Sequence, residues 1–160
     1  MAPERDALQD IAVVGGQAEV APGRAAAWLS KQVELGLTDV GLSVPQYRVL
    51  ALLSEGSAIS SIMARRLAVR PPSVSSLIDG LVGRGLVERR HNEDDRRTVS
   101  HQLTPAGRHL LAEADQAVDD RLAEIARSLP DQDAIDHAFE GLQLWQQAIT
   151  AHFRARLATG

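Results

Sequence analysis

The stretch Leu67-Ala-Val-Arg-Pro-Pro-Ser-Val-Ser-Ser-Leu-Ile-Asp-Gly-Leu81 carries the cleanest helical pattern in the chain. Its apolar side chains recur at intervals of three and four residues, which is the spacing of one helix face. Gly85 follows as a natural C-terminal residue of a helix. The pattern predicts a helix over residues 72–84 with one apolar face and one small polar face. The polar face consists of Ser73, Ser75, Ser76, Asp79, Gly80 and Gly83.

Short segments on either side of this helix complete a larger unit. Before it, residues 60–67 predict a short amphipathic helix. After it the period changes, and residues 86–91 and 98–103 have the composition of two strands. The six residues between them, 92–97, are all polar or charged, which is typical of an exposed hairpin tip. This order of elements over residues 57–103 predicts a winged helix-turn-helix.

Longer helices flank this unit. Residues 24–40 and 43–56 have helical patterns, each ended by a glycine. Thr104 followed by proline is a strong helix start, and apolar residues then repeat at helical spacing over about 25 residues. A last helix begins near Asp131 or Asp133. The apolar stripes of both C-terminal helices extend past a compact core, so we expect a second copy of the chain to cover them.

The sequence therefore predicts a mainly α fold with a small β-hairpin wing. We expect a partly mobile N-terminal arm over residues 1–23. The winged helix-turn-helix over residues 57–103 is the expected DNA-binding region. Residues 24–56 and 104–157 are expected to supply dimerisation helices and core support.

Composition excludes several classes of protein. The chain has 160 residues, about one domain, and no cysteine, which excludes disulfides, thiolate metal sites and thiol-based redox sensing. No apolar run approaches the length of a membrane helix, and the start Met1-Ala-Pro-Glu-Arg-Asp6 lacks the apolar segment of a secretory signal. We therefore expect a cytoplasmic protein with no membrane partner. Phosphate-loop, dinucleotide, serine-hydrolase and zinc-protease motifs are absent from the sequence, so we expect no enzyme, no metal and no cofactor.

Charge is unevenly distributed along the chain. The net charge is −4, which on its own argues against a nucleic-acid partner. Residues 57–108, however, contain nine arginines and five acidic residues, a balance of +4. The remainder contains eight basic and sixteen acidic residues, a balance of −8. A basic centre between acidic flanks is an electrostatic footprint for DNA.

The predicted unit has the mechanics of a DNA reader. A helix with one apolar face can lie in the major groove with its small polar face toward the base edges. Its serines lie near the N-terminus, where backbone N–H groups and the helix dipole favour a phosphate. An arginine on the hairpin tip suits a narrow minor groove. Two plainer interpretations stay open: a solvated serine face, and tip arginines neutralised by Asp94 and Asp95.

Five stretches stand in a characteristic order: Leu42-Ser-Val-Pro-Gln-Tyr-Arg-Val-Leu50, the helix segment Leu67 to Leu81, Arg84-Gly-Leu-Val-Glu-Arg89, Asp95-Arg-Arg97 and Leu103-Thr-Pro-Ala-Gly107. In this order, and with these loop lengths, residues 24–157 resemble the MarR family of bacterial transcription regulators. The resemblance implies an obligate homodimer joined through the first helix and the last two. It also implies repression from palindromic double-stranded DNA operators, and release by a small, often phenolic, effector.

The resemblance also implies roles for single residues. The three serines match recognition-helix positions that face DNA, and Arg97 matches the wing arginine that enters the minor groove. Arg89 and Asp95 match a pair that braces the wing. With arginines that can compensate for missing ones, the candidate DNA-binding set is Arg70, Ser73, Ser75, Ser76, Arg90, Arg96 and Arg97.

Some positions depart from the family pattern. Arg70 stands where the family usually has a serine N-cap, and Ser76 and Gly80 stand where an arginine is common. His101 replaces a usual valine, and it either packs in the wing or titrates there. Fewer cations therefore face DNA, and we expect binding that is strongly sensitive to salt.

Two further groups have a functional and a structural interpretation. Trp28, Tyr47 and Arg108 are candidates for an effector pocket between the dimer region and the DNA-binding region, although the first two also suit the core. His109 and Glu113 have the spacing of a metal-binding pair on a helix, but such pairs are common by chance. A different function for the whole chain also stays open: a winged helix that contacts protein partners, with weak or no specific DNA binding.

Overall fold

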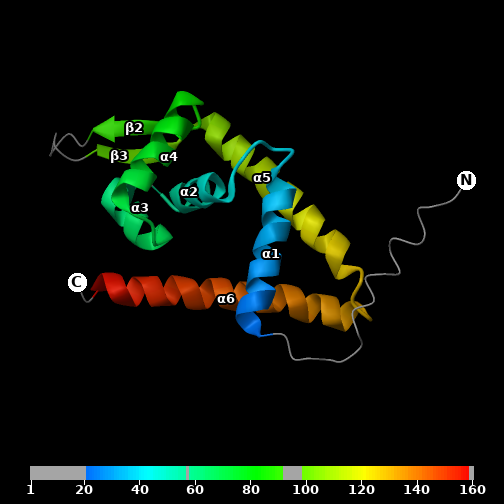
Figure 1. Ribbon diagram of the computed structural model, residues 1–160. Coiled ribbons are helices and arrows are strands. Elements are labelled where there is room, and N and C mark those ends of the chain that lie inside the picture. The colour runs from blue at the N-terminus through cyan, green and yellow to red at the C-terminus, as the bar shows by residue number, and fades with distance from the viewer. Residues whose placement is uncertain (1–20, 57, 92–98, 159–160) are drawn as a thin grey trace, which may run out of the picture.

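The computed structural model describes residues 21–56, 58–91 and 99–158, with side chains as far as Ala155. Six helices and three short strands follow one another along this part of the chain (Figure 1). The helices are α1 (Pro22–Leu37), α2 (Val44–Ser54), α3 (Ser60–Leu67), α4 (Pro71–Gly83), α5 (Pro105–Ala126) and α6 (Gln132–Ala158). The strands are β1 (Ala58–Ile59), β2 (Val87–His91) and β3 (Val99–Leu103). The mainly α fold with a hairpin wing is confirmed.

The expected N-terminal arm needs a correction at its boundary. Helix α1 begins at Pro22, inside the range 1–23, because a proline in the first turn costs no helical hydrogen bond. Residues 1–20 of that arm lie outside the described residues. The same helix ends at Leu37, three residues before the expected end at residue 40.

Local sequence signals explain where two of the helices start. Ser43 and Gln46 form a capping box, in which each side chain accepts a hydrogen bond from the other residue's backbone N–H (3.3 and 3.0 Å). The Thr104 hydroxyl accepts a hydrogen bond from the Gly107 backbone N–H at 3.0 Å, directly before α5. Both helix starts were visible in the sequence.

The sheet contains one strand that the sequence analysis missed. Strand β3 lies in the middle, antiparallel to both β1 and β2. Ile59, at the end of β1, holds the N-cap position of α3 in an extended conformation, without a side-chain cap bond. A run of two paired residues is too short to show a period of two, so only the pairing with β3 reveals this strand.

The core lies where the end of α1, α2, α3, α4, α5 and the base of the wing meet. Its largest fully buried side chains include Leu37, Leu50, Met63, Ile78 and Leu81. Burying a side chain of this size stabilises the fold by roughly 1.5–3 kcal/mol. The apolar face of α4 is thereby held against the core, and its polar face is left outside.

Helices α5 and α6 extend away from this core (Figure 1). Helix α5 leads from the wing to a turn at its far end, and α6 then runs back across α1. None of the described α6 side chains belongs to the core cluster, and Trp145 is 67% exposed. The interpretation of Trp28 as a core residue is wrong, because this residue, near the middle of α1, is 75% exposed. Among the described residues, no helix has both the length and the apolar character needed to cross a bilayer.

Candidate nucleic-acid interface

Helix α4 has the two faces that its sequence predicts. Val74, Ile78 and Leu81 are buried against the core. The three serines, Asp79 and Gly80 are exposed on the other side. At the centre of this outer face lie Ser76 and Gly80, which leave the backbone accessible to a groove of DNA.

The serine hydroxyls of α4 are held by their own helix. Ser75 Oγ donates to the Pro71 carbonyl and Ser76 Oγ to the Pro72 carbonyl, each at 3.2 Å. The hydroxyl protons therefore point back along the helix, and the oxygen lone pairs remain available to accept hydrogen bonds from base edges.

The start of α4 differs from the anion site suggested by the sequence. Pro71 and Pro72 occupy the first turn and have no N–H group, and the Ser73 N–H already donates to the Arg70 carbonyl at 3.0 Å. Backbone donors for a phosphate are therefore fewer than in an ordinary first turn. Arg70 is the N-cap residue and makes no side-chain cap bond, so an exposed arginine stands at this helix end.

The outward face of β2 carries a charged pair. Arg90 Nη2 lies 2.9 Å from Glu88 Oε1, and the Gln102 side-chain amide on β3 donates to the same carboxylate. These hydrogen bonds, first that from Gln102 and then that from Arg90, lower the pKa of Glu88. Arg90 is exposed, as the predicted DNA contact requires, but its guanidinium has an acidic neighbour in Glu88.

A second arginine of β2 contacts α4 itself. Arg89 Nη2 forms an ion pair with Asp79 Oδ1, which joins the wing strand to the outer side of α4. Sequence reasoning had placed Asp79 among the polar face residues without a partner. The expected brace between Arg89 and Asp95 stays a prediction, since Asp95, Arg96 and Arg97 lie outside the described residues.

His101 packs inside the wing. It is 5% exposed, and its Nδ1 lies 3.3 Å from the Ala58 carbonyl on β1. Burial lowers the pKa of His101, and the nearby Arg89 charge lowers it further. The imidazole is therefore held neutral, with its Nδ1 proton donated to Ala58.

Two of the three candidate pocket residues line different cavities. Trp28 lines a groove of about 740 Å³ between α1 and α5, whereas Tyr47 lines a separate cavity between α2, α5 and α6. Arg108 lines neither of these, and its Nη1 donates to the Leu103 carbonyl at 2.9 Å. The pocket that joins all three residues therefore stays a prediction that this single chain does not support.

The cavity beside Tyr47 has apolar walls and an acidic edge. Its volume is about 680 Å³, and Leu122, Phe139 and Leu142 contribute apolar surface. The Tyr47 hydroxyl donates to Asp115 Oδ1 at 2.6 Å. Burial and this hydrogen bond to a carboxylate raise the pKa of Tyr47, so the phenol stays protonated.

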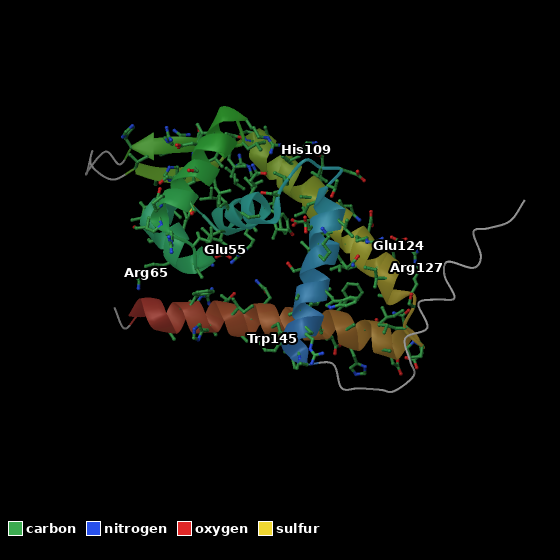
Figure 2. The ribbon with its side chains drawn as sticks, viewed as in Figure 1. Glu55, Arg65, His109, Glu124, Arg127 and Trp145 are labelled. Atoms are coloured by element: carbon green, nitrogen blue, oxygen red, sulfur yellow. The ribbon has the colours of Figure 1, made fainter. Side chains whose placement is uncertain are left out.

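The metal-binding spacing of His109 and Glu113 gives only an exposed pair. His109 Nε2 lies 3.3 Å from Glu113 Oε1, on the outer surface of α5 (Figure 2). Over the described ranges, no third histidine or carboxylate joins such a group to hold a metal ion. The spacing of His109 and Glu113 is explained by an ordinary surface contact between side chains one helical turn apart.

Comparisons with known proteins agree with this geometry. The family model described as MarR family matches residues 42–99. The transcriptional regulator AdcR of Streptococcus pneumoniae is 37% identical over 76 residues, which is 48% of this chain and 52% of AdcR. The HTH-type transcriptional repressor Mb2911 of Mycobacterium bovis is 30% identical over 96 residues, 59% of this chain and 69% of that repressor. The first of these matches thus spans about half the relative's length.

Solved structures extend the likeness over most of the chain. The repressor CouR bound to a 23-mer DNA duplex has a TM-score of 0.66 and 25% identity, covering 91% of this chain and 99% of CouR. CouR of Rhodococcus jostii RHA1 bound to p-coumaroyl-CoA has a TM-score of 0.61 and 28% identity, covering 76% and 85%. These relatives are regulators, in agreement with the expectation that the chain is no enzyme. The matched recognition segment, the similar repressor and the shared fold together show that the chain belongs to the MarR family.

Proposed function

We propose that this chain is a DNA-binding transcription regulator that acts in the cytoplasm as a homodimer and represses a palindromic operator. The observation that carries the proposal is the outer face of α4: small polar side chains, exposed beside an arginine-bearing wing strand. Such a face fits a major groove, and a hairpin beside such a helix suits the adjacent minor groove. The names of AdcR and the Mb2911 repressor, and the DNA-bound structure of CouR, support this assignment.

The dimer is supported by apolar surface that one chain leaves uncovered. Trp28 on α1 is one of its exposed large side chains. Trp145 on α6 is another (Figure 2). Leu144 and Ile149 continue the same exposure along α6. Most of the stability of a helix in a protein comes from packing of its apolar face, and the described side chains of α6, a helix of 27 residues, lie outside the core. A second copy supplies a packing surface for α6 symmetrically.

The dimer sets the geometry of the operator. Each subunit offers one α4 to a major groove, so the two half-sites lie about one helical turn, or 10–10.5 bp, apart. Arg70, Arg96 and Arg97 supply cations around each helix, and the serines accept hydrogen bonds from the bases. Because two of the described arginines, Arg89 and Arg90, have acidic neighbours, the cationic surface is modest.

An effector is the second part of the proposal. The cavity between α2, α5 and α6 has room for a small aromatic molecule, and CouR, a related protein, has been solved bound to p-coumaroyl-CoA. Asp115 and Asp119 stand near Tyr47 and disfavour an anionic ligand. A neutral phenol therefore suits this cavity better than an aromatic carboxylate, and it releases DNA only if it binds the released conformation more tightly.

Selection from a random-sequence DNA pool, followed by fluorescence anisotropy across a salt series, tests the proposal. The expected result is one enriched palindrome, bound far more tightly than a scrambled duplex and with a steep salt dependence. Equal, weak binding to both duplexes would instead favour the protein-contact module. A screen that measures thermal stability and DNA binding in the presence of neutral phenols tests the effector. If neither measurement changes with any phenol, the effector proposal is wrong.

A further inference from the structure

We propose that Arg89 is a DNA phosphate contact and that Asp79 is the residue that orients it. Together they form a clamp on the phosphate strand between the groove that holds α4 and the groove that the wing enters. This inference rests on the proposed DNA-binding function. It gives a direct role to an arginine that family resemblance places only in a structural brace of the wing.

Strand alternation places Arg89 on the side of the wing that faces α4. Val87, two residues earlier on β2, is buried in the core, and side chains two apart share one face of a strand. Glu88 and Arg90 point to the opposite face, where they pair with each other. Arg89 stands opposite His101 in the register of β2 and β3, and its guanidinium reaches past the buried imidazole to the outer side of α4.

Helical geometry places Asp79 at the flank of the reading face. At about 100° per residue, Asp79 lies about 60° around α4 from Ser76, on the side toward β2. Ser76 and Gly80 lie at the middle of the exposed face. The ion pair therefore lies at the junction of α4 and the wing, to one side of the face that would contact the bases. It leaves the centre of that face free.

DNA geometry then identifies what faces that junction. A helix in the major groove and a hairpin in the adjacent minor groove must stand on either side of one sugar–phosphate strand. A side chain located between the helix and the hairpin meets the phosphates of that strand. Arg89 is such a side chain, and it is 49% exposed.

The chemistry of the pair suits a phosphate. Asp79 engages Nη2 of Arg89, and a guanidinium has five N–H donors, so donors remain for phosphate oxygens. The carboxylate fixes a long side chain before DNA arrives, which lowers the ordering cost of binding. Without Arg89, the same carboxylate stands near phosphates as a repelling charge. Asp79 thus helps binding through Arg89 and opposes it when alone.

The effect of Asp79 on DNA affinity thus changes sign when Arg89 is removed, and this change can be tested. Full-length wild type, Arg89→Ala, Arg89→Lys, Asp79→Ala and the double variant Asp79→Ala/Arg89→Ala are titrated with the wild-type-enriched duplex and with its scrambled form. Arg127→Ala is the matched control, because it removes one exposed arginine at the far end of α5 (Figure 2). Circular dichroism and thermal unfolding check that each variant is folded.

Arg89→Ala is expected to weaken binding about tenfold on both duplexes, the loss of one charged hydrogen bond. It should also lower the slope of log affinity against log salt by about one. Arg89→Lys should keep the slope and recover part of the affinity. Asp79→Ala should weaken wild type by about threefold but strengthen the Arg89→Ala protein by a similar factor, as expected for an exposed charge.

Other outcomes overturn the inference. If Arg89→Ala behaves like Arg127→Ala, Arg89 makes no phosphate contact. If Asp79→Ala strengthens binding in both backgrounds, Asp79 is a repelling acid and orients nothing. A wild type that enriches no sequence and binds no duplex would contradict the proposed function as well. That failure is distinguishable from a failure of the inference alone, because it is seen in the wild type and depends on no variant.

Discussion

The α-carbon of Gly107 lies against the backbone of Leu86, so closely that a Cβ built on Gly107 would stand 2.0 Å from the Leu86 carbonyl oxygen. The two residues belong to the first turn of α5 and the segment that leads into β2. This contact joins the start of α5 to the base of the wing through backbone atoms, which cannot move aside as a flexible side chain can. The Leu86 carbonyl also accepts a hydrogen bond from the Thr104 N–H at 3.1 Å.

Gly107→Ala should therefore destabilise the protein by about 3 kcal/mol, the upper part of the range for overpacking. Urea unfolding measures the change as a lower midpoint at constant slope. Gly141→Ala in α6 is the control, because nothing lies within 4 Å of its added Cβ and the substitution favours the helix. Equal midpoints for the two variants would contradict the close contact.

Stability should depend on pH through His101. Its pKa in the folded chain lies below the ordinary value of 6.5, so between these two values the unfolded state binds more protons than the folded state. The free energy of unfolding therefore falls as the pH drops from 6.5 toward the lowered pKa. His101→Val should flatten this part of the profile, whereas replacing the exposed His137 by glutamine should leave it in place. Chemical unfolding at several pH values measures both.

Tyr47→Phe should lower stability by about 1 kcal/mol, because it removes a hydrogen bond to the Asp115 carboxylate and little else. Asp115→Asn keeps an acceptor at the same position and should cost less. The urea midpoints of the two variants give the comparison. A Tyr47→Phe protein as stable as wild type would mean that water replaces the Tyr47 hydroxyl as the partner of Asp115 without loss of stability.

Trp145→Glu should shift the protein from dimer toward monomer, since it places a charge in the apolar surface of α6. Sedimentation equilibrium measures the dissociation constant directly. Gln147→Glu adds the same charge about 200° around the helix, on the opposite side, and should leave the dimer intact. Dimers of equal strength in both variants would remove this face of α6 from the interface.

Ser76→Glu should abolish specific DNA binding without unfolding the chain, because it adds a negative charge at the centre of the exposed face of α4. Ser128→Glu, between α5 and α6, adds the same charge outside the wing and helix unit. Anisotropy titrations at two salt concentrations compare them. Retained affinity in Ser76→Glu would show that the outer face of α4 is not the reading face.

The local features of the fold could be predicted from the sequence, and the long-range ones could not. The helix over 72–84 is observed as Pro71–Gly83, and Gly85 after it has the positive φ (70°) that its position predicts. Those signals depend on neighbours in the chain. By contrast, Ala68 takes a left-handed conformation (φ 54°) at the end of α3, where a glycine would be expected.

The site shows the same division. The serine face of α4 follows from a period of 3.6, so its exposure was predictable. The pairing of Arg89 with Asp79 depends on the angle at which the hairpin leaves the core, which no local pattern encodes. The exposure of Trp28 could not be predicted either. A large apolar side chain is expected inside a protein, and only the packing of α1 shows that a single chain leaves Trp28 uncovered.

The Thr104 hydroxyl, directly before α5, donates a hydrogen bond to the Gly85 carbonyl at 2.7 Å. This bond couples the start of α5 to the end of α4, so the two helices move together. The helix has 22 residues and is about 33 Å long, at 1.5 Å per residue. A tilt of only about 5° around one end moves the other by about 3 Å, close to the rise of one base pair along a DNA strand. In the proposed dimer, small rearrangements near Tyr47 can in this way take the two α4 helices out of register with the grooves of DNA.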